Sequence, residues 1–131
     1  MNGTDLHKTA ADCAEELPGA RLEHPFVPDW EVCKVRGKVF MLMTDVPGRP
    51  VVILKADPGE ADALREQYSH ITPGYHMNKK YWITLESGEG VGKEFVGELV
   101  TDSYRLVVAH LPTAERPVDP RTYGTGTRAA R

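Results

Sequence analysis

The sequence predicts an α+β fold, in which helices pack on one side of a mainly antiparallel β-sheet. Several β-rich segments follow one another with only short turns between them, whereas a parallel sheet would place a helix between each pair of strands. Helical periodicity is confined to three segments, near the start, the middle and the end of the chain. The length of 131 residues fits one domain, and a composition of 40% hydrophobic and 27% charged residues is that of an ordinary globular protein.

The chain begins with a predicted helix over residues 4–17. Apolar residues recur there at helical spacing, from Leu6 to Leu17, and Thr4 is the expected N-cap. Pro18-Gly19 ends this helix. Residues 21–23 then form a short predicted strand.

Three strands in series are predicted over residues 30–35, 38–44 and 51–55. These segments are rich in β-branched, aromatic and methionine residues. Arg36-Gly37 separates the first two as a hairpin turn, and residues 46–50 form the next turn. Short links of this kind predict an antiparallel meander.

The second half adds a helix, a strand and a last helix. Asp57-Pro58 is typical of a helix start, and this helix is expected to end near Ser69. Residues 79–86 alternate as a strand, which places Trp82 and Lys80 on one face of the sheet. Residues 91–111 predict a helix, with a break allowed at residues 101–103.

The C-terminal segment differs in composition from the rest. From residue 113 the chain is rich in Pro, Gly, Thr and Arg and has little apolar periodicity. We therefore expect a single domain over residues 1–112, followed by a flexible basic tail over residues 113–131.

Charge alternates along the chain in blocks. Residues 1–31 carry two basic and seven acidic side chains, whereas residues 32–55 carry five basic and one acidic. Residues 71–85 carry two lysines and no acid. The basic blocks coincide with predicted strands and the acidic blocks with predicted helices. If helices cover one face of the sheet, the other face should be a basic surface.

The cysteines, the N-terminal residues and the short apolar runs indicate the cellular compartment. Cys13 and Cys33 have no CxxC spacing and lie in predicted elements, so we expect free thiols in a reducing compartment. The first residues lack the basic and apolar regions of a signal peptide. The longest purely apolar run, residues 39–43, is far shorter than a membrane span. We expect a cytoplasmic protein that makes no use of a membrane.

One segment carries a resemblance to a known family. Residues 73–82, PGYHMNKKYW, resemble the PGYHMNKRHW signature of the MmcQ/YjbR family. Residues 34–40, KVRGKVF, resemble its KVGGKMF hairpin, and residues 54–58, LKADP, resemble its LKCDP junction. Residues 102–112, DSYRLVVAHLP, resemble its DSYELVVAKLP helix. The motifs occur in the family's order and extend the resemblance over residues 5–112, nearly the whole domain.

The resemblance implies a fold and, less directly, a function. Members of this family have a CyaY-like, double-wing arrangement in which helices back an antiparallel sheet. The family is described as DNA-binding by analogy with the double-wing domain of a phage transcription factor. Fold analogy does not fix function, so the residues must carry the argument.

The residues themselves predict a basic and aromatic binding surface. Cations would contact phosphates, and aromatic rings such as Trp82 and Tyr75 would stack on bases. The alternative for Trp82 is a place in a second small core. The candidate binding residues are Lys34, Arg36, Lys38, Lys55, Tyr75, His76, Asn78, Lys79, Lys80 and Trp82.

Two other classes of function are alternatives to DNA binding. The same surface, from Tyr75 to Trp82, would also suit a protein-interaction or small-ligand module. An enzyme is not expected, because the five histidines show no metal-ligand spacing and no nucleotide-binding motif occurs. The segment from Gly88 to Lys93 lacks the spacing of a phosphate loop, and the acidic first helix is expected to be a solvated face. The sequence therefore predicts no cofactor and no metal.

Overall fold

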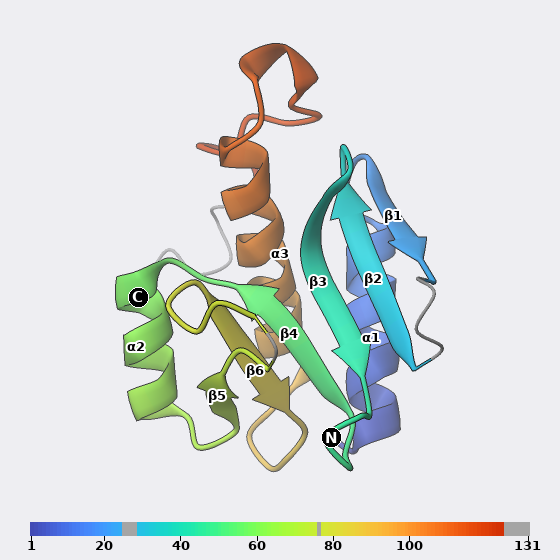
Figure 1. Ribbon diagram of the computed structural model, residues 1–131, viewed down its shortest axis with the longest axis vertical. Coiled ribbons are helices and arrows are strands. Elements are labelled where there is room, and N and C mark those ends of the chain that lie inside the picture. The colour runs from blue at the N-terminus through green and yellow to red at the C-terminus, as the bar shows by residue number, and fades with distance from the viewer. Residues whose placement is uncertain (25–28, 76, 125–131) are drawn as a thin grey trace.

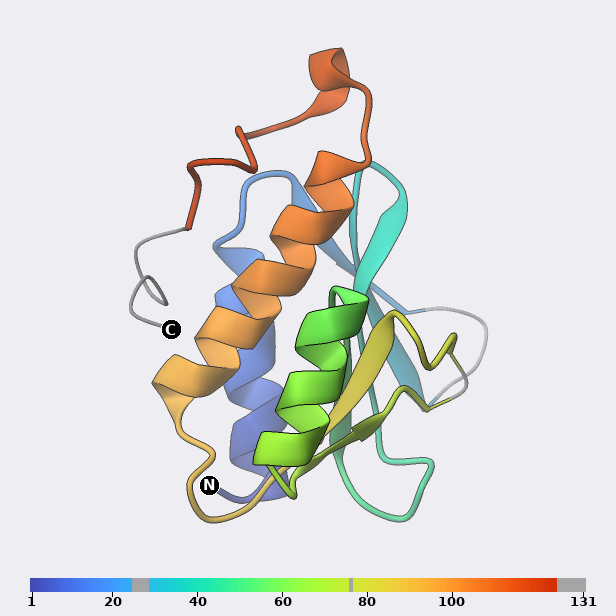
Figure 2. The ribbon, with the colours of Figure 1, turned by 90° about the vertical axis from the view of Figure 1, so that its left-hand side faces the viewer.

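The computed structural model describes residues 1–24, 29–75 and 77–124, and it confirms the predicted α+β class. A six-stranded, antiparallel sheet has the strand order β1-β2-β3-β4-β6-β5 (Figure 1). Three helices lie on one side of this sheet (Figure 2). The elements are α1 (Gly3–Glu15), β1 (Ala20–Glu23), β2 (Trp30–Val35), β3 (Lys38–Thr44), β4 (Val51–Lys55), α2 (Pro58–Gln67), β5 (Ile71–Pro73), β6 (Trp82–Glu86), α3 (Lys93–Ala109) and the short 3-10 helix η1 (Thr113–Glu115).

The predicted meander is confirmed as β2-β3-β4, but some boundaries differ. Asn2, not Thr4, caps α1, because its Oδ1 accepts a hydrogen bond from the Asp5 amide at 2.8 Å. The helix α3 begins at Lys93 and continues without a break through residues 101–103.

The segment predicted as a strand over residues 79–86 is strand only from Trp82 onward. Residues 78–81 form a turn instead, in which the Tyr81 amide donates to the Asn78 carbonyl at 3.1 Å. The strand β5 was not predicted, because it spans only three residues and ends in a proline.

The main core lies between the sheet and the three helices. Its centre is Tyr104 of α3, which is fully buried and meets the Phe40 ring edge-on at 5.5 Å. The Tyr104 hydroxyl donates to the Pro18 carbonyl at 2.5 Å. Burial raises the pKa of Tyr104 to about 12, so the hydroxyl remains a donor across the ordinary pH range.

A β-bulge at Phe40 links α3 to the sheet. The register passes from Cys33–Met41 to Lys34–Val39, so Phe40 has no partner on β2. The buried hydroxyl of Ser103 donates to the Phe40 carbonyl at 2.5 Å and accepts from the Lys55 amide at 2.8 Å. One side chain of α3 therefore satisfies two backbone groups where the ladder between β3 and β4 ends.

A second, smaller core covers the opposite face of the sheet. Val51, Ile53 and Trp82 form its buried centre. This is the alternative that the sequence left open for Trp82. Partly buried side chains that pack around this centre are Trp30, Val39, Leu42, Tyr75 and Met77.

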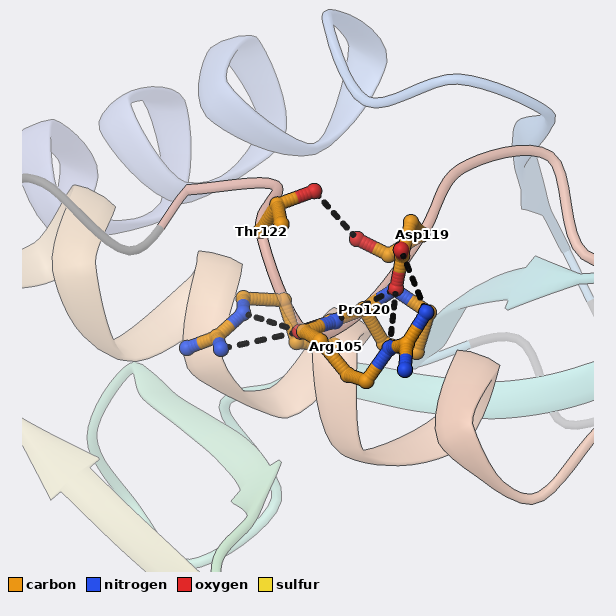
Figure 3. Close-up of polar contacts among 5 residues, drawn as sticks. Arg105, Asp119, Pro120 and Thr122 are labelled. Atoms are coloured by element: carbon orange, nitrogen blue, oxygen red, sulfur yellow. Dashed lines mark hydrogen bonds and ion pairs between the residues drawn. The ribbon is translucent and has the colours of Figure 1, made fainter.

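The described part of the C-terminal segment contacts α3. The Arg105 side chain of α3 donates two hydrogen bonds to the Pro120 carbonyl, at 3.1 and 2.9 Å (Figure 3). Tyr123 packs on Tyr104, with ring centroids 6.0 Å apart. Residues 113–124 therefore fold back on α3, while residues 125–131 lie outside the described residues.

Candidate nucleic-acid interface

The loop of residues 74–81 connects β5 to β6 and depends on a glycine where it starts. Gly74 donates its amide to the Trp82 carbonyl at 2.9 Å. A Cβ added at Gly74 would lie 2.5 Å from the Trp82 Cβ, so no other residue fits at this close approach. Next along the chain, the Tyr75 amide donates to Thr84 Oγ1 at 2.8 Å, and the buried Thr84 hydroxyl donates to the Pro73 carbonyl at 3.0 Å. These contacts fix where the loop leaves β5.

The polar residues of this loop are partly committed to its own turn. Asn78 accepts the Lys80 amide on its Oδ1 at 2.9 Å, which is a local turn contact and not a ligand contact. Lys79 donates from Nζ to the Gly74 carbonyl at 3.1 Å, and Lys80 lies 5.7 Å from the centre of the Tyr81 ring. All three side chains are nevertheless exposed. His76, also predicted as a binding residue, lies outside the described residues.

The aromatic residues are less available than the sequence predicts. Trp82 is only 9% exposed and Tyr75 is stacked against Trp30, with centroids 6.2 Å apart. We therefore assign base stacking to neither Trp82 nor Tyr75. Tyr81, in contrast, is 39% exposed.

Lys55 is the last residue of β4 and lies opposite Trp82 on β6. Because directly opposed residues share a face, Lys55 belongs to the face that the helices do not cover. Its backbone amide is held by Ser103 of α3, which fixes the strand end that carries it.

The β2–β3 hairpin carries three of the predicted cations, but they do not share one face. Lys34 opposes Val39 and so lies on the helix-free face, where its Nζ is 3.7 Å from Glu23 Oε2. Lys38 opposes Val35, which belongs to the main core, so Lys38 lies toward the helix side. Arg36 occupies the turn itself.

Arg36 adopts a backbone conformation that side chains avoid. Its φ of 51° is the only positive value for a non-glycine residue within the described ranges. A left-handed residue other than glycine costs about 1 kcal/mol. The Arg36 Nε donates to the Glu115 carbonyl at 3.0 Å, so the strained turn is tied to the C-terminal segment.

The strand register gathers the cations at one end of the sheet. The ends of β2 and β4 and the starts of β1, β3 and β6 meet there, and the loop of residues 74–81 joins them. We call this region the basic end, and its cations are Arg21, Lys34, Arg36, Lys38, Lys55, Lys79 and Lys80. The opposite end of the sheet carries Glu31, Asp45 and Glu86, the last of which is paired with Arg49 at 2.6 Å.

This layout corrects the predicted basic face. The middle of the helix-free face is apolar, and the cations lie along one end of the sheet rather than over its surface. Arg21 was not predicted, because it lies in a strongly acidic block of sequence. Only its register opposite Lys34 reveals its place.

The described residues also bear on metal binding, cysteine chemistry and membrane insertion. Among them, no three His, Cys, Asp or Glu side chains converge as metal ligands. Cys13 and Cys33 are free thiols, as predicted. Burial raises the pKa of Cys33 to about 12 and also raises that of Cys13, so neither is a thiolate nucleophile at neutral pH. In the part of the chain that the structure describes, no helix is long and apolar enough to cross a bilayer.

Comparison with known proteins gives one consistent family. The YjbR family model matches residues 15–106. The uncharacterized protein YbdF of Escherichia coli O157:H7 is 43% identical over 108 residues, which cover 82% of this chain and 88% of YbdF. The uncharacterized protein YjbR of Escherichia coli K12 is 35% identical over 101 residues, covering 76% and 84% of the two chains.

Solved structures agree with this assignment. The crystal structure of Deinococcus radiodurans DR2400, which contains a DUF419 domain, superposes with a TM-score of 0.74 and 32% identity, covering 88% of this chain and 85% of that one. A Pseudomonas syringae protein superposes with a TM-score of 0.65 and 28% identity, covering 81% and 98%. With this sheet, these motifs and these relatives, the chain belongs to the YjbR family.

Proposed function

We propose that this protein is a binding module without catalytic activity, and that its basic end contacts the phosphate backbone of DNA. The observation that supports the proposal is the separation of charge. Cations gather at one end of the sheet, while acids lie at the other end and on the helices. A DNA duplex that approaches the basic end would meet positive potential first, although the chain as a whole has a net charge of −3.

The contacts expected from this geometry are to phosphates and not to base edges. Lys79 and Lys80 are exposed on the loop, and Lys55 lies at the strand end beside it. Lysines act on phosphate as point charges and carry no sequence information. We therefore expect binding that varies strongly with salt and weakly with sequence.

The test is fluorescence anisotropy of labelled duplex and single-stranded DNA at low salt. The variant Lys79→Glu/Lys80→Glu reverses two charges at the basic end. The matched control, Lys8→Glu/Lys93→Glu, makes the same change in net charge at exposed positions on α1 and α3. We expect the first variant to lose affinity by about tenfold or more and the control to stay within about twofold of wild type.

Two results would contradict the proposal. Equal losses in both variants would mean that only net charge matters, and the basic end would have no special role. No binding by the wild-type protein at low salt would exclude DNA as the ligand.

A second candidate is a protein or small-molecule partner at the surface of residues 75–82. The observation that favours it is Tyr81, which is 39% exposed beside Lys80. An amphipathic ring at a surface is typical of partner contacts. Binding of this kind would persist at high salt and would be weakened by Tyr81→Ala, whereas DNA binding would be lost as salt rises.

A further inference from the structure

A hollow beside the β2–β3 hairpin is lined by more positive than negative side chains. It has a volume of about 510 Å³ and lies between β1, the β2–β3 turn and the C-terminal segment. We call it the hairpin hollow. Its charged lining residues are Arg21, Glu23, Lys34 and Arg36, and Gly19, Gly37 and Pro117 complete its wall.

Two cations of the hollow are held side by side by the strand register. Arg21 on β1 lies directly opposite Lys34 on β2. Like charges in directly opposed positions repel each other. Glu23 is the one acid in the lining, and its carboxylate reaches Lys34 only at 3.7 Å. The Arg21 side chain has no hydrogen bond or ion pair with any side chain or backbone group that the structure describes, although its backbone belongs to the β1–β2 ladder.

Arg36 supplies the third cation from its strained position in the turn. Its Nε is fixed by the Glu115 carbonyl, so the guanidinium has a defined place in the lining. Within the described residues, its two terminal nitrogens donate no hydrogen bond. Strained backbone persists where the surroundings hold it, and here it carries a cation into a concave site.

We propose that the hairpin hollow is a binding site for a phosphate group. Three cations against one carboxylate leave an excess of positive charge, and the lining includes no large apolar side chain. Guanidinium groups donate parallel hydrogen bonds that match phosphate oxygens. The volume is also within the range of pockets that hold small ligands. The hollow shares Arg21, Lys34 and Arg36 with the basic end, but the inference goes beyond the proposed function because it requires neither DNA nor the loop lysines.

The test is titration of the ¹⁵N-labelled full chain with inorganic phosphate at constant ionic strength, followed by amide chemical shifts. We expect saturable shifts at Arg21, Lys34 and Gly37, with a Kd below about 1 mM, and no such shifts with chloride. Shifts that do not saturate, or that spread equally over other surface lysines, would overturn the proposal.

Variants separate the site from general charge and from folding. Arg36→Gly suits the left-handed turn, so it should fold at least as well as wild type while losing phosphate affinity by about tenfold. Arg21→Ala should show a similar loss. Lys93→Ala is the matched control, because it removes one charge from an exposed position that lies outside both the hollow and the basic end. A loss with Lys93→Ala as large as with Arg21→Ala would overturn the proposal.

The phosphate could come from a terminal monoester or from a backbone diester. Binding of short oligonucleotides with and without a 5′-phosphate distinguishes these two sources. Tighter binding of the phosphorylated form would identify a terminal monoester as the ligand, and equal binding would identify the backbone diester. The variant Lys79→Glu/Lys80→Glu should keep its affinity for inorganic phosphate. If phosphate binds to the hollow but DNA does not bind to the protein, the hollow stands and the proposed function fails.

Discussion

Replacement of Ser103 by alanine should destabilise the protein far more than the loss of one oxygen atom suggests. The Ser103 hydroxyl is fully buried and satisfies both the Phe40 carbonyl and the Lys55 amide. Each buried backbone group left without a partner costs about 1–3 kcal/mol. The space left by one hydroxyl is too small for a water molecule, which occupies about 30 Å³ in the liquid. We therefore expect a loss of about 2–4 kcal/mol in the free energy of unfolding.

The assay is equilibrium unfolding in urea at 25 °C. The midpoint should fall while the m-value stays unchanged, because the surface exposed on unfolding is nearly the same. Ser69→Ala is the control, since Ser69 is exposed, and its effect should stay within about 0.5 kcal/mol. A loss below about 1 kcal/mol for Ser103→Ala would refute the reasoning, because it would show that the two backbone groups find other partners.

Two further predictions concern stability. Gly74→Ala should destabilise the protein by about 2 kcal/mol or more and shift the amide signals of the loop residues, because the new methyl group would overlap Trp82; an unchanged urea midpoint would contradict this close approach. Cys33 should make stability fall above pH 9, because the unfolded thiol loses its proton near that pH while burial raises the folded pKa to about 12. Between pH 8 and pH 10.5 the free energy of unfolding should fall by about 2 kcal/mol in wild type and by less in Cys33→Val. An equal fall in both proteins would exclude Cys33 as its source.

Much of the fold follows from the sequence because its signals are local. The three helices, the meander of β2, β3 and β4, and the faces of β6 all obey the periodicity of their side chains. The strand β5 escapes this reasoning, because three residues ending in proline acquire strand geometry only by pairing with β6. The bulge at Phe40 is likewise a property of the pairing and not of either strand alone.

The candidate site was predictable in its residue types but not in its arrangement. The clustering of lysines and aromatics is visible in the sequence around residues 75–82. The burial of Trp82 and the stacking of Tyr75 on Trp30 depend on how the loop folds over the sheet. The place of Arg21 depends on a register that no local pattern encodes.

The C-terminal segment makes contacts that its composition does not reveal. Residues rich in Pro, Gly and Arg predict a flexible tail, and within the described part Arg105 and Tyr104 of α3 contact residues 120 and 123. These are tertiary contacts, which no local pattern in the sequence encodes. The same segment contributes Pro117 and the Glu115 carbonyl to the surroundings of the basic end.

The most direct test of the proposed interface is the dependence of duplex DNA affinity on salt concentration. The slope of log K against log salt is about −0.9 for each phosphate neutralised, so wild type should give a slope of about −3 or steeper. Lys79→Ala/Lys80→Ala should flatten the slope by about 2, and Lys8→Ala/Lys93→Ala should leave it unchanged. A slope near zero, or the same slope in all three proteins, would contradict the claim that the basic end binds the DNA backbone.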